Sequence, residues 1–330
     1  MTAAADEIIP GLIRLEEIDG TRLLCQFLLV SGQELIIVDA GLPSSPWDTI
    51  VPTINELGFE PADITLVLTH PDADHCGGTA SLRAAYPRLK VVAHADDSPP
   101  LGSPSDTITQ RYNTFARTDN MGLDSSALAR IAGRLGAGFE VDERITCERW
   151  FSHRQTRAAI VHIPGHSHGH LGIWMPDKRA LVAGDAVMGY GIRNLDGSLL
   201  YPPQFLSRST YEATLDRIAG LNVDILLCAH EAPMYGADVA AFIKDSRDAI
   251  GALEANVKAA LNSGAETLAD LCQAIHENYP GLPPNRAADL APSAAAILQD
   301  LQANGTVQIN TVGGLRRFQS IVPRMCDENT

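Results

Sequence analysis

The sequence predicts a layered α/β fold. The chain has 330 residues, which is enough for one large domain with a smaller one beside it. Eight short apolar runs, rich in Ile, Leu and Val and mostly bounded by turn residues, are typical of buried strands. Stretches with helical periodicity separate several of these runs, and strands that alternate with helices indicate an α/β arrangement.

The expected strands lie in the first two thirds of the chain. They cover residues 23–30, 35–38, 64–68, 91–93, 158–163, 171–175, 180–183 and 225–229. Helical patterns cover residues 46–57, 79–86 and 209–221. Residues 96–138 begin with the loop-forming stretch DDSPPLGSPSD and continue with weaker helical segments, so we interpret them as an insertion, or lid, over a site.

Helical periodicity dominates the last third of the chain. Helices are expected over residues 239–262, 268–278 and 287–303, and strand-like runs at 307–310 and 315–321 follow. Helices followed by a small hairpin suggest a winged-helix-like module. We therefore expect a catalytic domain over residues 1–236, with the insertion at about 96–138, and a C-terminal helical module over 237–330.

Composition narrows the range of partners. The net charge of −15 argues against a nucleic-acid or anionic-membrane binder, because phosphates would be repelled overall. No apolar stretch approaches the roughly 20 residues of a membrane span, and no signal peptide is visible. Six cysteines without a CxxC pair favour free thiols in the cytoplasm. These features favour a small-molecule substrate, small or uncharged rather than polyanionic.

The strongest chemical motif is His70-Pro71-Asp72-Ala73-Asp74-His75. It places four potential metal ligands within six residues, directly after the expected strand at 64–68. A strand end followed by a tight turn can aim such side chains into one space. Imidazole and carboxylate ligands together suit zinc, iron or manganese.

Three later segments repeat this placement. His166 follows the run at 158–163, Asp185 follows the run at 180–183, and His230 follows the run at 225–229. Each is a ligand-type residue just past the end of an expected buried strand. Because ligands gathered at strand ends form a site on one edge of a sheet, the sequence predicts a metal centre there.

This ordered set resembles the metallo-β-lactamase-fold hydrolase superfamily, which includes glyoxalase II and lactonase-like enzymes. That family has the pattern H-x-H-x-D-H, then a His in a PGH turn, an Asp in a GD pair and a final His. Residues 37–41 (IVDAG) and Gly77-Gly78 also match. The resemblance covers residues 11–236 and implies an αββα sandwich. Asp72 replaces the second His, giving an H-x-D-x-D-H variant.

The resemblance implies two divalent transition-metal ions, with zinc favoured and iron or manganese as alternatives. Carried over by position, the metal ligands are His70, Asp72 and His166 for one ion, Asp74, His75 and His230 for the other, and Asp185 as a bridge. Asp74 would be the catalytic proton shuttle, and Asp39 would orient a ligand. The extra carboxylate of Asp72 makes the site less positive and favours harder metals. A mononuclear site with Asp72 unligated is the alternative.

The implied function is hydrolysis of an ester, lactone, thioester or amide bond of a small molecule by a metal-bridging hydroxide. Two alternatives stay open: a metal-dependent endoribonuclease that uses the C-terminal module for RNA, and a mononuclear iron oxygenase of the same fold. Arg316-Arg317 with Arg324 is a short basic cluster and a weak footprint for RNA, and the charge of −15 argues against an RNA substrate. The C-terminal module could instead pack on the catalytic domain or mediate a homodimer.

A competing motif surrounds Ser167. Residues 165–169 (GHSHG) match G-x-S-x-G, the nucleophile elbow of serine hydrolases. The elbow requires a strand, a sharp turn and then a helix, whereas residues 171–177 are typical of a strand ending in a turn. The serine mechanism also leaves the motif at residues 70–75 unexplained, so we favour the metal centre.

Overall fold

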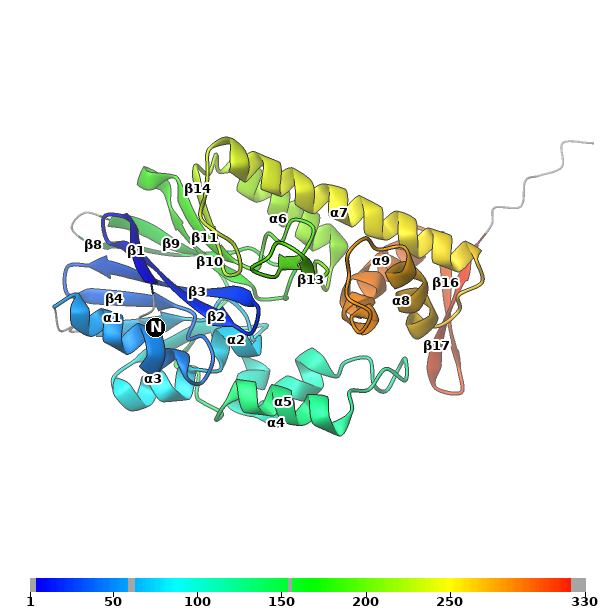
Figure 1. Cartoon of the computed structure of the whole chain (residues 1–330), viewed down its shortest axis with the longest axis horizontal. Helices are drawn as coiled ribbons and strands as arrows, with labels where there is room; N and C mark the ends of the chain where they lie inside the picture. The colour runs from blue at the N-terminus through cyan, green and yellow to red at the C-terminus, as the bar shows by residue number, and fades with distance from the viewer. Residues whose placement is uncertain (1–3, 59–62, 154–155, 322–330) are drawn as a thin grey trace, which may run out of the picture.

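Two β-sheets packed face to face form the centre of the protein, with helices on both outer faces (Figure 1). The computed structural model describes residues 4–58, 63–153 and 156–321. This αββα sandwich is the fold that the sequence predicts. None of the described helices is both long and apolar enough to cross a membrane.

The first sheet has seven strands. Their spatial order is β1 (Ala4–Ile9), β2 (Leu12–Asp19), β3 (Arg22–Ser31), β4 (Glu34–Val38), β5 (Asp63–Val67), β6 (Lys90–His94) and β7 (Glu143–Ile145). Strands β1 to β4 pair with one another in antiparallel fashion, whereas β4 to β7 pair in parallel. The helical segments η1 (Pro46–Ile50), α1 (Val51–Glu56) and α3 (Thr79–Ala85) pack on its outer face.

The second sheet has six strands. Their spatial order is β15 (Met234–Tyr235), β14 (Ile225–Cys228), β11 (Ala180–Gly184), β10 (Leu171–Met175), β9 (Thr156–His162) and β8 (Arg149–His153). Helix α6 (Arg208–Gly220) covers its outer face, and a small ribbon of β12 (Ile192–Arg193) and β13 (Leu199–Tyr201) lies beside the sheet. All eight expected strands and all three expected helices of this region are confirmed, with ends shifted by one or two residues.

Side-chain alternation explains how one strand serves two layers. Along β3, Phe27 and Leu29 belong to the apolar layer between the sheets, together with Ile173 of β10. Leu28, which points the other way, packs with Ile54 of α1 in the layer under the outer helices. The metal-ligand candidates follow β5, β9, β11 and β14 of the same two sheets, so the packed core fixes the points from which they extend.

The C-terminal segment packs on the helical side of the second sheet. It contains α7 (Ala237–Asn262), α8 (Leu268–Glu277), η5 (Ala287–Leu290), α9 (Ala291–Ala303) and the hairpin of β16 (Val307–Val312) and β17 (Leu315–Ser320). The expected helices followed by a hairpin are thus confirmed. One apolar cluster runs from Val161 of β9 through Leu215 of α6 to Ile243 and Ile297. The C-terminal helices therefore share a core with the second sheet.

The insertion lies below α2 in the view of Figure 1 and extends toward the C-terminal hairpin. It contains η2 (Pro99–Gly102), α4 (Pro104–Thr107), η3 (Ile108–Tyr112) and α5 (Ser125–Leu135). At its far end, Arg316 of β17 forms an ion pair with Asp119, 2.6 Å apart. One of the three arginines that suggested RNA binding, Arg316, is therefore engaged within the protein, and Arg324 lies outside the described residues.

Candidate metal centre

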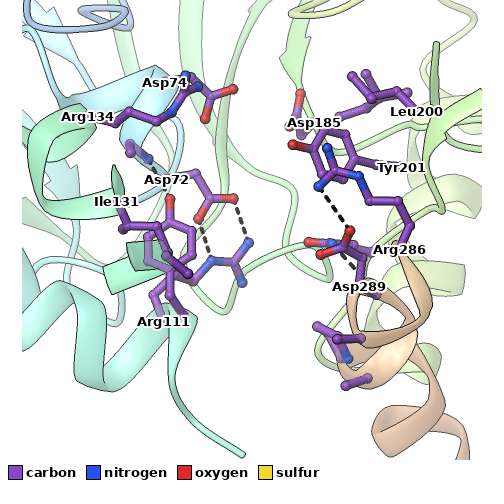
Figure 2. A pocket seen from close by; sticks show the side chains of 18 of the residues that line it. Asp72, Asp74, Arg111, Ile131, Arg134, Asp185, Leu200, Tyr201, Arg286 and Asp289 are labelled. Atoms are coloured by element: carbon purple, nitrogen blue, oxygen red, sulfur yellow. Dashed lines mark hydrogen bonds and ion pairs between the residues drawn. The ribbon is translucent and has the colours of Figure 1, made fainter. Parts of the chain in front are cut away.

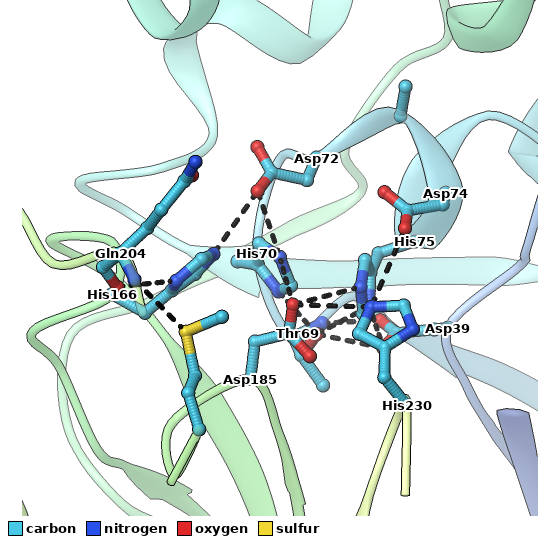
Figure 3. A network of polar contacts seen from close by, with 12 residues as sticks. Asp39, Thr69, His70, Asp72, Asp74, His75, His166, Asp185, Gln204 and His230 are labelled. Carbon is cyan, nitrogen blue, oxygen red and sulfur yellow. Dashed lines mark hydrogen bonds and ion pairs between the residues drawn. The ribbon is translucent and has the colours of Figure 1, made fainter. Parts of the chain in front are cut away.

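All seven ligand candidates lie at one edge of the sandwich (Figure 3). Four of them lie in or just before the short helix α2 (Ala73–Cys76), which follows β5, and the others follow β9, β11 and β14. Six form two groups in which the ligand atoms lie within 4.8 Å of one another. We call His70, His166 and Asp185 the first cluster, and Asp74, His75 and His230 the second cluster. All six side chains are buried.

Asp185 lies between the two clusters. Its Oδ2 atom is 3.9 Å from Nε2 of His70, 3.6 Å from Nε2 of His75 and 3.5 Å from Nε2 of His230. Burial raises the pKa of Asp185, but His230 and His75 outweigh that effect and hold the pKa well below its usual value. One carboxylate thus faces imidazoles from both clusters, which is the placement that a bridging ligand requires.

Hydrogen bonds on the far side of each ring fix how the histidines face the centre. Nδ1 of His75 donates to Asp39 over 2.7 Å. Nδ1 of His230 donates to the Leu23 carbonyl over 2.8 Å, and Nδ1 of His166 donates to the Gln204 carbonyl over 2.9 Å. Because each Nδ1 carries the proton, each Nε2 presents a lone pair to the cluster.

The buried Nε2 atoms provide a test of whether a metal fits. Nε2 of His70, His75 and His230 has no hydrogen-bond partner among the described residues. An unpaired buried nitrogen destabilises the fold by roughly 1–3 kcal/mol. One divalent ion in each cluster would accept these lone pairs, His70 in the first cluster and His75 and His230 in the second, together with the nearby carboxylates. The donor set therefore fits two ions of the zinc, iron or manganese type.

Asp39 supports this arrangement from behind. It adopts a left-handed backbone conformation (φ 63°) and is 3 % exposed. Its carboxylate accepts hydrogen bonds from the Thr69 amide and hydroxyl, each 2.8 Å long, as well as from His75. Asp39 therefore orients His75, which is the role that the family resemblance implied.

Asp72 adjoins the first cluster but has a second partner. Its Oδ2 atom is 3.1 Å from Nε2 of His166 and 3.3 Å from Nε2 of His70. Arg111 of η3 binds the same carboxylate through both oxygens, with N–O distances of 2.5 and 2.8 Å (Figure 2). Burial raises the pKa of Asp72, but Arg111 holds the pKa well below its usual value. The guanidinium offsets the extra negative charge that Asp72 brings.

Asp74 is held by a second arginine. Nη2 of Arg22 lies 2.5 Å from Oδ2 of Asp74 and 2.9 Å from Oδ2 of Asp19. The same Asp74 oxygen is 3.6 Å from Nε2 of His230. Burial raises the pKa of Asp74, but Arg22 contributes most to holding the pKa below its usual value. Asp74 therefore stays ionised and faces both the second cluster and the cavity.

His170 and Ser167 have structural partners. The His170 ring stacks on His70, with centroids 4.9 Å apart, and its Nε2 accepts a hydrogen bond from the Asp185 amide. The Ser167 hydroxyl is buried and donates to Asp97 over 2.5 Å. Strand β10 follows the Ser167 turn, where a nucleophile elbow requires a helix. Ser167 is therefore not placed as a nucleophile.

The fold and this edge site together define a family. Residues 24–230 match the metallo-beta-lactamase superfamily (Lactamase_B). This match covers more than half of the chain, and the chain belongs to that superfamily. A metallo-beta-lactamase family protein of Thermus thermophilus has a similar structure, with a TM-score of 0.71 and 18% identity over 96% of this chain and 100% of that one.

Curated relatives are distant in sequence. An atrochrysone carboxyl ACP thioesterase of Pseudocercospora fijiensis is 21% identical over 98% of this chain and 84% of its own length. A hydroxyacylglutathione hydrolase of Cupriavidus taiwanensis is 27% identical over 62% of this chain and 63% of its own length. A lactamase-like protein of Pestalotiopsis microspora matches over 50% of this chain but only 39% of its own length. These relatives support a hydrolase activity in general terms.

Sequence reasoning missed the arginines of the site. Arg22 lies in β3 and Arg111 in η3, 52 and 39 residues away from the aspartates that they bind. Neither residue belongs to a motif with recognisable spacing. Only the fold brings them to the centre.

Proposed function

We propose that this protein is a metal-dependent hydrolase that cleaves an acyl bond of a small molecule, with an ester or thioester as the preferred bond. The observation that carries the proposal is the convergence of three unpartnered, buried Nε2 atoms on Asp185. The printed functions of the thioesterase and hydroxyacylglutathione hydrolase relatives support an acyl bond, and a thioester in particular.

Two sets of residues, which share Asp185, would bind two metal ions. When two divalent ions are bound, they supply hydroxide near neutral pH and polarise a carbonyl oxygen. His70, Asp72, His166 and Asp185 would hold one ion, and Asp74, His75, His230 and Asp185 would hold the other. We favour zinc, with iron or manganese as alternatives.

Asp74 is the proton carrier in this proposal. It lines the cavity beside Asp185, and its carboxylate stays ionised next to Arg22. It can therefore accept a proton from the attacking water and pass it to the leaving group. Arg22 keeps Asp74 in place because Asp19 holds the same guanidinium from the other side.

The test joins metal analysis to activity. The full chain, purified without chelators, should contain about two transition-metal ions per chain by plasma mass spectrometry. It should hydrolyse simple acyl thioesters and esters, lose that activity after chelation and regain it when zinc, iron or manganese is restored. Unchanged hydrolysis by protein stripped of metal would overturn the proposal.

A further inference from the structure

A cavity extends from the metal centre into the space between the insertion and the C-terminal helices (Figure 2). Its volume is about 490 Å³, within the range of small-molecule sites. Asp74 and Asp185 lie at the metal end. The far end is formed by α5 of the insertion and by η5 and α9 of the C-terminal segment.

The charge of the cavity wall differs from that of the whole protein. Five arginines and five aspartates line the cavity, with no lysine or glutamate. The chain as a whole has 25 basic and 40 acidic residues, so the wall is enriched in basic groups. Three of the five aspartates, Asp72, Asp74 and Asp185, are metal-ligand candidates. Divalent ions bound there therefore leave the cavity positively charged.

Three of the arginines are fully engaged in ion pairs. Arg22 binds Asp19 and Asp74, and Arg134 binds both carboxylate oxygens of Asp19. The third, Arg111, binds both oxygens of Asp72, as described above. These three guanidiniums bind aspartates of the cavity wall and leave few N–H donors for a ligand.

The other two arginines face the far end from separate parts of the chain. Arg130 of α5 is exposed and makes no hydrogen bond or ion pair within the described ranges. Arg286, directly before η5, has one ion pair, 3.3 Å long, with Asp289. The Arg286 guanidinium also lies over the Tyr201 ring, 4.1 Å from its centroid. Both arginines therefore retain donors for a ligand.

Asp289 determines the net charge at the far end of the cavity. It forms an ion pair with Arg286; burial raises the pKa of Asp289, and the charges of Arg286 and Arg130 act against that rise. With Asp289 ionised, the group of Arg130, Arg286 and Asp289 carries one net positive charge. A singly charged carboxylate matches that charge, whereas a phosphate dianion exceeds it. Apolar side chains also line the cavity; they include Ile131, Ile192, Leu200 and Pro292.

We propose that Arg130 and Arg286 bind a substrate carboxylate, and that the substrate is an acyl compound whose carboxylate is separated from the scissile bond by an apolar segment. The assignment of the scissile bond rests on the proposed function, whereas carboxylate binding does not require turnover. This inference narrows the expectation of a small or uncharged substrate to a small substrate with one carboxylate, because the charge of the cavity differs from that of the chain as a whole.

A binding experiment tests the carboxylate site without catalysis. Isothermal titration calorimetry compares octanedioate with octanoate on the zinc-loaded full chain. Both ligands offer one carboxylate to the metal centre, but only octanedioate has a second one for the far end. We expect octanedioate to bind about 10- to 100-fold more tightly, the usual range for a charged hydrogen bond. Equal affinities would overturn the proposal.

Variants connect this preference to the two arginines. Arg130→Gln and Arg286→Gln should each lower the octanedioate preference several-fold, and the double variant should bring it close to one. Arg149→Gln is the matched control, because Arg149 forms an exposed ion pair with Glu143 and does not line the cavity. A preference that survives in the double variant would overturn the assignment. Thermal melting of each variant shows whether it is folded.

Two further measurements test the kind of anion that binds and the reaction that follows. Binding of 8-phosphonooctanoate should be weaker than that of octanedioate, and stronger binding would contradict a carboxylate site. The monothioester of octanedioate should exceed its methyl-capped analogue in kcat/KM by about 10- to 100-fold. If octanedioate binds through Arg130 and Arg286 but no thioester or ester is hydrolysed, the proposed function fails while the carboxylate site stands.

Discussion

The two metal-ligand clusters differ in what supports them. In the second cluster, His75 and His230 are oriented by Asp39 and by the Leu23 carbonyl, which belong to the first sheet or directly follow one of its strands. In the first cluster, His166 is oriented by the Gln204 carbonyl of a loop. Nη2 of Arg111, from the insertion, lies 2.9 Å from Nε2 of the same His166.

This difference has a consequence for metal affinity. A guanidinium that donates to Nε2 of His166 competes with a metal ion for that lone pair, whereas Nε2 of His75 and His230 is unpartnered among the described residues. The histidine Nε2 lone pairs of the second cluster are therefore more available to a metal ion than that of His166 in the first cluster. We expect it to bind its ion more tightly and to fill first.

The largest expected effect comes from the residue that the clusters share. Replacing Asp185 with Asn removes the central negative charge from both clusters at once. We expect metal content to fall towards zero and kcat/KM to fall by about a thousandfold or more. Metal analysis and thioester hydrolysis measure these effects. Full metal content with normal turnover in this variant would show that Asp185 does not bridge.

A matched pair of variants tests the order of affinity. His230→Ala should remove the tightly bound ion, and His166→Ala should remove the more weakly bound one. In competition with a chromophoric chelator, His166→Ala should therefore retain one tight ion, whereas His230→Ala should retain only the weaker one. Losing a histidine ligand should weaken the binding of its ion at least 10- to 100-fold, which is the loss of affinity typical of removing a residue that only hydrogen-bonds a ligand. The reverse order would contradict the comparison.

Arg111→Gln should have a smaller effect that depends on metal. Without its partner, Asp72 is left as a largely buried charge, 14% exposed, and the metal-free protein should lose about 3–5 kcal/mol of stability. A divalent ion can neutralise Asp72, so zinc should raise the melting temperature more in this variant than in the wild type. The double variant Asp72→Asn, Arg111→Gln should lose that additional increase. A zinc-induced rise in melting temperature that is the same in Arg111→Gln as in the wild type would show that Asp72 does not bind the metal.

Ser167→Ala should have the smallest effect. The hydroxyl donates to Asp97 in a buried position, so its loss should lower the free energy of unfolding by about 1 kcal/mol. Turnover and metal content should stay at wild-type levels, because Ser167 belongs to neither cluster. Loss of turnover with both ions still bound would revive a serine mechanism.

Local sequence patterns determined most of the sandwich and the set of ligand candidates. A buried strand shows itself as a short apolar run, and a ligand directly after it is positioned by that strand. For this reason the motif at residues 70–75, together with His166, Asp185 and His230, was recognisable from the sequence. Strands β1 and β2 were missed because charged residues such as Asp6, Glu7, Glu16 and Glu17 interrupt their apolar pattern.

The arginine partners were decided by the tertiary structure. Arg111 reaches Asp72 from the insertion, and Arg130 and Arg286 face one cavity from segments more than 150 residues apart. Nothing in the spacing of these residues encodes their partners, because the energy of an ion pair depends on the distance across the fold and on the removal of water. The sequence therefore determined which side chains are available to bind metal, and the tertiary structure decided which charges surround them.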